Sequence, residues 1–335
     1  MIRSYFQELI TTTRDGWNHF WFTPADPATL GILRIMTGLM LLYTHAVWGL
    51  ELNAFFGPGG HLTAEFARGM HDNSPWAWSY LYAIQSPSML RAVHLLAFVP
   101  LAMFTVGLFT RPASVMAYLV TVSYAHRAVG ALYGLDQINA FLTLYLAISP
   151  SGDAYSLDNW RGSARQGRGV EKSTMANIGQ RLIQVHMCVV YLFAGLGKLL
   201  GSSWWAGMAL WGAFANFEYQ TLDMTWVSHH PLLVNAMTQV ILVWEIGYIV
   251  LVWPRLTRPL VLALAIPLHL GIAICMGMTT FGLIMLVGNF SFVPPGATKR
   301  FVASITGLLR GSMTSRHPSR TMASGSERPM RAQRL

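Results

Sequence analysis

Of the ionisable side chains inside or at the ends of apolar segments of this 335-residue chain, ten are the strongest candidates for chemistry. Ionisable groups are costly within a bilayer, so their presence there indicates a function or a specific pairing. Lysine and histidine can exchange a proton, whereas arginine and carboxylates can hold a charged group. The candidates are Arg34, His45, His94, His126, Arg127, Asp136, His186, Lys198, Glu245 and His269.

The composition indicates the membrane that would surround these residues. The chain is 53% hydrophobic and 11% charged, with a mean hydropathy of +0.41, whereas soluble domains carry about 25% charged residues. Its twelve Trp, twelve Tyr and seventeen Phe are typical of aromatic belts at two bilayer surfaces. We therefore predict an all-α fold, a polytopic membrane bundle of about eight transmembrane helices, with seven as the alternative count.

The predicted spans follow the apolar runs, and the fourth and the last two are short enough to tilt or to be partly re-entrant. They are Ala28–Leu50, Met89–Leu108, Pro112–Val129, Gly134–Ser149, Ile178–Leu200, Leu232–Trp253, Pro259–Cys275 and Met278–Val293.

The distribution of Lys and Arg predicts the orientation, because cytoplasmic loops are enriched in both. Nearly all of them fall on the side of the two termini, which we therefore place in the cytoplasm; the expected location is the inner membrane of a bacterium. This distribution also explains the net charge of +9 better than nucleic-acid binding does. We predict an N-terminal cytoplasmic or interfacial segment (1–27), a transmembrane bundle (28–295) and a basic, disordered tail (296–335) that contacts anionic lipid.

Two long outer loops are each expected to carry an interfacial helix. In the first, Ser74 followed by Pro75 is typical of a helix start. In the second, Trp204, Met208 and Trp211 begin a stripe that suits an interfacial helix, although plain membrane anchoring explains the stripe as well.

Seven of the ionisable residues fall in the outer half of the membrane, which predicts a site at the outer mouth of the bundle. Each also has a structural explanation: Lys198 and Arg127 could extend to the interface, and a single histidine can join two helices. Arg34 and Glu245 lie deeper, and we predict that they form a structural ion pair, because an unpaired buried charge is costly. The seven outer residues are His45, His94, His126, Arg127, Asp136, Lys198 and His269.

No metal site is predicted. Cys188 and Cys275 lie in apolar stretches without metal or redox spacing, and no nucleotide-binding or hydrolase motif occurs.

The stretch Val190-Tyr191-Leu192-Phe193-Ala194-Gly195-Leu196-Gly197-Lys198-Leu199, followed by Trp204-Trp205-Ala206-Gly207, resembles the HTTM family, the transmembrane domain shared with vitamin K-dependent gamma-carboxylase. Similar segments are Trp17 to Gly38, Leu132 to Leu135, Tyr155 to Asp158, Trp244-Glu245, and His269 to Leu286, so that the resemblance covers roughly residues 17–295.

The resemblance implies a membrane enzyme linked to a lipid-soluble quinone similar to vitamin K, with Lys198 as the general base. A lysine in an apolar pocket loses hydration, which favours the neutral amine that can accept a proton. His269 and His126 would relay protons as further catalytic residues. The residues expected to line the substrate site are Arg127, Asp136, His45, His94, Trp204 and Trp205.

The sequence departs from the family at two positions: the first of two adjacent family lysines is Gly197 here, the second being Lys198, and a family histidine is Val129. The carboxylase also continues into a large extramembrane domain, where this chain has a short basic tail, so carboxylation of a protein substrate is not expected. There are two alternatives to the enzyme. The first is a non-enzymatic module that binds a quinone, a lipid or a protein partner, and the sequence does not identify that partner. The second is a transporter of a small solute. The transporter ranks last because its polar residues should reach the midplane.

Overall fold

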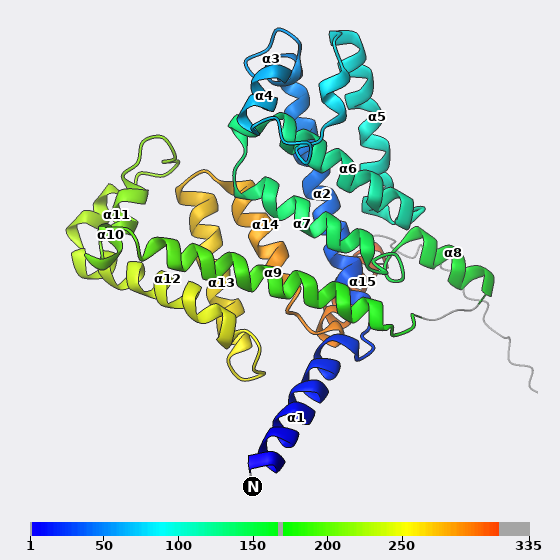
Figure 1. Cartoon of the computed structure of the whole chain (residues 1–335), viewed down its shortest axis with the longest axis vertical. Helices are drawn as coiled ribbons and strands as arrows, with labels where there is room; N and C mark the ends of the chain where they lie inside the picture. Colours follow the sequence, from blue (N-terminus) through cyan, green and yellow to red (C-terminus); the bar gives the residue numbers. More distant parts are fainter. Residues whose placement is uncertain (1, 167–169, 315–335) are drawn as a thin grey trace, which may run out of the picture. The chain divides into compact units, whose positions relative to one another are not determined.

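The computed structural model describes residues 2–166 and 170–314, and all the regular structure in these residues is helical (Figure 1). Outside the helices, a single isolated β-bridge joins Ala25 and Ser173. The predicted all-α fold is therefore confirmed. The chain divides into one unit from Met1 to Pro295 and a second from Gly296 to Leu335.

Each predicted span coincides with a helix to within four residues at either end. Local sequence explains several boundaries: the Ser86 hydroxyl accepts a hydrogen bond from the Met89 amide ahead of Pro87, and Ser173 accepts one from Ala176 in the same way. The helices are α2 (Ala28–Leu50), α5 (Pro87–Val106), α6 (Thr110–Arg127), α7 (Gly134–Ile148), α9 (Thr174–Lys198), α12 (Pro231–Leu251), α13 (Arg258–Cys275) and α14 (Thr279–Phe290).

Four of these helices, α2, α5, α12 and α13, are long and apolar enough to cross a membrane by length and composition. The other four are shorter or more polar. In α9 the polarity has a structural use, because the amides of Gln180 and Gln184 both donate to the carbonyl of Ser291 at 2.7 and 2.8 Å. Such groups need partners inside the protein, so a buried helix of a bundle can carry them.

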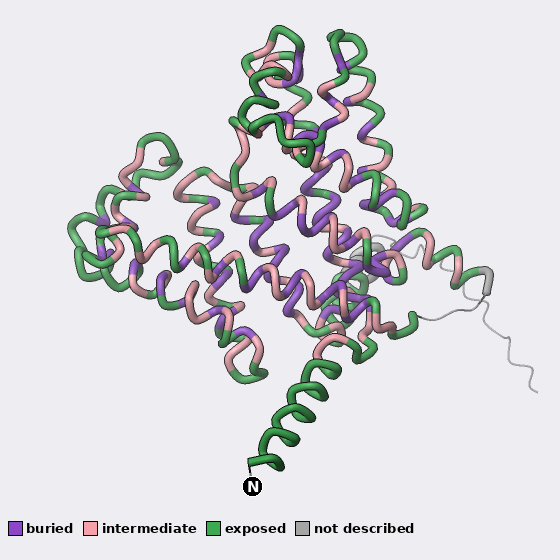
Figure 2. Tube along the Cα trace, viewed as in Figure 1, coloured by how far each residue is buried: buried purple, intermediate pink, exposed green. Residues whose placement is uncertain are grey.

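Helices α2, α7, α9 and α14 all contact one another and contain many of the buried residues (Figure 2). Further pairs join α5 and α6 to one side of this group, and α12 and α13 to another. Gly195 lets α9 approach α12 closely, since a Cβ there would lie 2.7 Å from Cγ1 of Ile246.

The predicted outer loops contain short helices, but the first has none starting at Ser74-Pro75 and the second has two where we predicted one. The first carries α3 (Leu52–Phe56), α4 (Ala64–Met70) and the 3-10 helix η1 (Tyr80–Ala83); Ser74-Pro75 lies in turns, after Asp72 and Asn73 with positive φ. The second carries α10 (Ser202–Trp205), α11 (Ala209–Phe214) and the 3-10 helix η3 (Thr225–His229). The predicted single stripe is interrupted at Gly207, whose φ of 70° no continuous helix allows.

Three more helices and one short turn complete the described residues. Helix α1 (Ile2–Phe22) has no buried residue, α8 (Leu157–Gln166) follows α7, and the 3-10 turn η2 (Val129–Ala131) precedes α7. In the second unit α15 runs from Pro295 to Thr314, a part of the tail for which we predicted disorder. Residues 315–335 lie outside the described residues.

Candidate functional site

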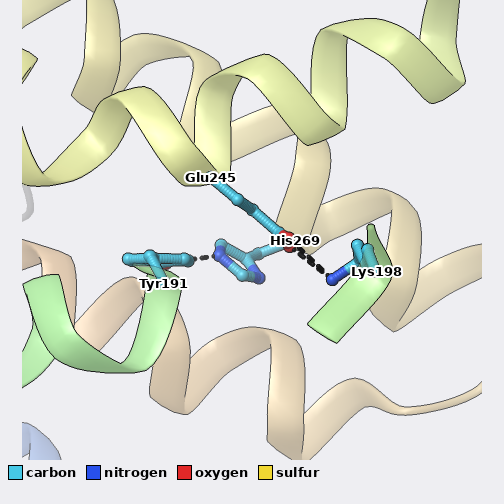
Figure 3. Close-up of polar contacts among 4 residues, drawn as sticks. All are labelled: Tyr191, Lys198, Glu245 and His269. Atoms are coloured by element: carbon cyan, nitrogen blue, oxygen red, sulfur yellow. Dashed lines mark hydrogen bonds and ion pairs between the residues drawn. The ribbon is translucent and has the colours of Figure 1, made fainter. Parts of the chain in front are cut away.

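The Lys198 ammonium and the Glu245 carboxylate form an ion pair, with Nζ 2.8 Å from Oε1 and 2.7 Å from Oε2 (Figure 3). Lys198 ends α9, and Glu245 lies in the second half of α12, opposite Gly195. The Lys198 side chain is 25% exposed and that of Glu245 13%, so the pair is only partly accessible. The Trp204 ring lies 5.3 Å from Nζ, within the range of a cation–π contact.

A buried hydrogen-bond network lies beside this pair. The imidazole of His269, from α13, has Nε2 2.7 Å from the hydroxyl of Tyr191, from α9. Tyr191 accepts from Nδ2 of Asn289 at 2.6 Å, and Asn289 Oδ1 accepts from the Tyr248 hydroxyl at 2.8 Å. Figure 3 shows the imidazole between Tyr191 and the ion pair, and the Lys198 charge acts electrostatically on His269.

The network determines which nitrogen of His269 carries the proton. Asn289 Nδ2 also donates to the Met285 carbonyl at 2.9 Å, so its orientation is fixed by donors and acceptors on both sides. The Tyr191 hydroxyl accepts from Asn289, and His269 Nε2 is the acceptor that the described residues offer for the hydroxyl's own proton, so Tyr191 donates to Nε2. Nδ1 then carries the single N–H hydrogen of the neutral imidazole, and within the described residues this buried N–H has no partner. It is free to donate to a ligand.

The predicted ion pair between Arg34 and Glu245 is wrong. Glu245 pairs with Lys198, whereas Arg34, which is fully buried, donates to main-chain carbonyls of the loop after α7. These bonds reach the carbonyls of Ser151, of Ala154 at 3.3 Å and of Tyr155 at 2.6 Å. Carbonyl oxygens can satisfy a guanidinium without a carboxylate, an option that the sequence pattern did not reveal.

Two of the predicted outer histidines form a separate cluster between α2, α5 and α6. The rings of His45 and His94 stack with centroids 4.0 Å apart, and both are buried. His45 Nε2 lies 2.9 Å from the His94 carbonyl, and His94 Nδ1 lies 2.8 Å from the Tyr124 hydroxyl. His186 likewise bonds to a tyrosine, with Nδ1 3.0 Å from the hydroxyl of Tyr145. These contacts join helices.

His126 and Arg127, at the end of α6, hold the first outer loop. His126 Nδ1 lies 2.8 Å from the carbonyl of Trp78, and Arg127 donates to the carbonyl of Phe56 at 3.2 Å. Neither has a contact with Lys198 among the described residues. The proton relay that we predicted for His126 therefore has no support in these contacts.

The remaining predicted residues are divided between two places. Trp204 covers Lys198, and Trp205 is 68% exposed while its indole N–H donates to the Leu199 carbonyl at 2.7 Å. Asp136 accepts from the Tyr133 amide at 3.1 Å at the start of α7 and lines a cavity there. The predicted outer site is thus several sites, and Lys198, His269 and Trp204 form one of them.

Sequence reasoning missed Tyr191, Tyr248 and Asn289. Tyr191 lies seven residues before Lys198, two turns away on the same face of α9, and Asn289 is a lone amide in an apolar run. Both signals were available, but tyrosine and asparagine are not ionisable at neutral pH and did not stand out among charged groups.

Comparison with known proteins gives one match. A model of the HTTM domain matches residues 22–296, which is most of the chain. No curated protein and no solved structure matches it.

Proposed function

The chain belongs to the HTTM family and is an integral membrane protein, and from this and from the geometry at Lys198 we propose that it is a membrane enzyme that removes a proton from a lipid-soluble quinol. The observation that carries the proposal is the Lys198–Glu245 pair next to the unpaired N–H of His269. A base and a hydrogen-bond donor that face one small region are the two groups that deprotonation of a hydroxyl requires.

The Lys198–Glu245 pair can account for both proton transfers that formation of a quinolate requires. Movement of one proton from the Lys198 ammonium to the Glu245 carboxylate, over 2.7–2.8 Å, gives a neutral amine and a carboxylic acid. A low-dielectric surrounding favours this exchange, since it removes two charges. The amine then takes the hydroxyl proton of the quinol and becomes an ammonium again, while the quinol becomes a quinolate.

His269 would hold the oxygen on which this negative charge develops. Its Nδ1–H is a buried donor, and an unpaired buried donor costs about 1–3 kcal/mol that a ligand oxygen would recover. Tyr191 fixes the tautomer by donating to Nε2, so that Nδ1 cannot become an acceptor without breaking the network. Tyr191 is therefore a positioning residue.

We also propose an orientation of the chain in the membrane. Both termini would face the cytoplasm of a bacterial inner membrane, since the basic loops lie on that side of the predicted spans. The Lys198 site would then open toward the outer leaflet, from which a lipid-soluble quinol could enter sideways.

The test is anaerobic titration of the protein in uncharged detergent with a reduced isoprenoid quinone, with formation of bound quinolate followed by its ultraviolet difference spectrum. We expect stoichiometric quinolate with the wild type and none with Lys198→Arg, because a guanidinium cannot act as the base. Lys172→Arg makes the same exchange at an exposed loop lysine and should behave like the wild type.

Lipid extraction and mass spectrometry of purified wild type and Lys198→Ala separate chemistry from binding. Quinone retained by both proteins would assign Lys198 to the chemistry. If neither folded protein retains or binds a quinone, the proposal fails and a module that binds a protein partner becomes the better explanation. Quinolate formation that is unchanged in Lys198→Arg would refute the lysine as base.

A further inference from the structure

A cavity lies apart from Lys198, where α2 ends and α7 begins. Its volume is about 410 Å³, which is within the range of small-molecule sites. Tyr43 and Val47 line it from one face of α2 and are 56% and 45% exposed, so the cavity is open on the side of this helix. For a helix that crosses a bilayer, such an exposed face meets lipid, and a ligand could enter from the membrane.

The lining of this cavity combines aromatic rings with negative charge. Four rings contribute to it, and two of them, Trp48 and Phe55, pack edge to face with centroids 5.2 Å apart. The carboxylates of Glu51 and Asp136 also line it, whereas none of its lining residues is basic, and neither carboxylate has an ion pair within the described part of the chain. The four aromatic residues are Tyr43, Trp48, Phe55 and Tyr133.

An unpaired oxygen continues the site inward. Asp136, Thr44 and Trp48 also line a small neighbouring cavity of about 30 Å³, which Asn139 reaches from one turn further along α7. Asn139 is only 2% exposed, and its Oδ1 has no partner among the described residues. The polar end of the site therefore offers acceptor oxygens, and its lining has no lysine or arginine; the buried imidazole of His45 also lines the small cavity.

We infer that this cavity binds an amphipathic organic cation, a quaternary ammonium or amine attached to an apolar body. Ring faces attract a cation through their quadrupoles, and the attraction grows to about 2 kcal/mol or more when the cation is desolvated. Aspartate at the third residue of α7 would add its charge, and the apolar lining suits the body of the ligand. A neutral or anionic ligand would bring no positive charge to either carboxylate, so the cavity should select against it.

The test is isothermal titration calorimetry of the full chain in dodecyl maltoside, which is uncharged, with benzyltrimethylammonium as the probe. Neopentylbenzene, in which carbon replaces the charged nitrogen, is the neutral comparison. We expect the charged probe to bind at least tenfold more tightly than the neutral one. Asp136→Asn, which keeps an acceptor for the Tyr133 amide, should lower the affinity for the charged probe about tenfold.

The controls separate this site from general charge effects and from loss of fold. Glu218→Gln removes an exposed charge from the other outer loop and should leave the affinity unchanged. Trp48→Leu removes an aromatic ring without changing the charge, and it should weaken binding of the charged probe on its own. This second variant keeps the test decisive if Asp136→Asn does not fold. Equal affinity for the two probes, or unchanged affinity in folded Asp136→Asn and Trp48→Leu, would overturn the inference.

Discussion

Breaking the Lys198–Glu245 pair should destabilise the protein more when the lysine is removed than when the glutamate is replaced by glutamine, because Glu245 is the more buried partner. At 2.7 Å and an effective dielectric constant of about 20, the gross attraction is about 6 kcal/mol. Desolvation of both ions offsets much of this, and the 25% exposure of Lys198 allows solvent screening. The net coupling should therefore lie between surface and buried pairs, at about 1–3 kcal/mol.

A double-mutant cycle measures this coupling directly. The variants are Lys198→Met, Glu245→Gln and their combination, with the free energy of unfolding obtained by denaturant titration in mixed micelles. Lys198→Met should cost more than Glu245→Gln. The methionine variant leaves a carboxylate that is 13% exposed without its cation, whereas the glutamine variant leaves an ammonium that is 25% exposed and can extend toward solvent from the end of α9.

A second cycle with Arg34 discriminates between the two partners that Glu245 could have had. Arg34 bonds to carbonyls and not to Glu245, so Arg34→Met combined with Glu245→Gln should be additive within about 0.5 kcal/mol. A Lys198–Glu245 coupling below about 0.5 kcal/mol, or an Arg34–Glu245 coupling above 1 kcal/mol, would refute the assignment of the pair.

Two further predictions concern the end of the bundle that is predicted to face the cytoplasm. Arg34→Met should lower the free energy of unfolding by about 3 kcal/mol, because three main-chain carbonyls, those of Ser151 and Ala154 buried and that of Tyr155 partly buried, lose their donor. Replacement of an exposed arginine, as in Arg91→Met, should change it by less than about 0.5 kcal/mol in the same titration. Burial alone would raise the pKa of Asp158, but hydrogen bonds from Thr110 and from the Phe109 amide outweigh it and lower the pKa. Asp158 should therefore contribute its full stabilisation above the ordinary carboxyl pKa of about 3.9, and this stabilisation should be lost as the pH falls through the lower pKa of the folded state. Asp158→Asn should remove this part of the pH dependence of the free energy of unfolding. A variant whose pH profile matches that of the wild type would contradict the assignment.

The helices could be predicted from the sequence because the bilayer imposes a length on every apolar run. Ala28–Leu50 was predicted to the residue, since charged or breaking residues bound the run at both ends. The outer loops were less predictable. Ser74-Pro75 has the local chemistry of a helix start, yet the chain there is in turns, and its neighbour Ser79 bonds to Ser123 at 2.8 Å instead. Tertiary contacts decided the conformation where local preference was weak.

The candidate site was predictable in part, through Lys198 and His269, because ionisable residues in apolar helices are conspicuous. Their partners were not. Glu245 seemed to suit Arg34 because both were expected deeper in the membrane, but depth does not say which residues face each other around the bundle. Arg34 turned out to be satisfied by carbonyls, which are invisible in a list of side chains.

The depth of a residue in the membrane and the neighbouring helix that its side chain faces are therefore separate quantities. Both must agree before two residues of the outer half can belong to one site. Hydropathy orders residues along the membrane normal, and it places His45, His94 and Lys198 in one leaflet. Helix contacts place the two histidines between α2, α5 and α6, while Lys198 faces α12. Contact between helices is not enough, since α2 and α7 also contact α9. A residue takes part in the Lys198 site only if its side chain faces that end of α9 and α12, as His269 does beside Tyr191. The separate position of Asp136 is the reason to expect two ligands and not one.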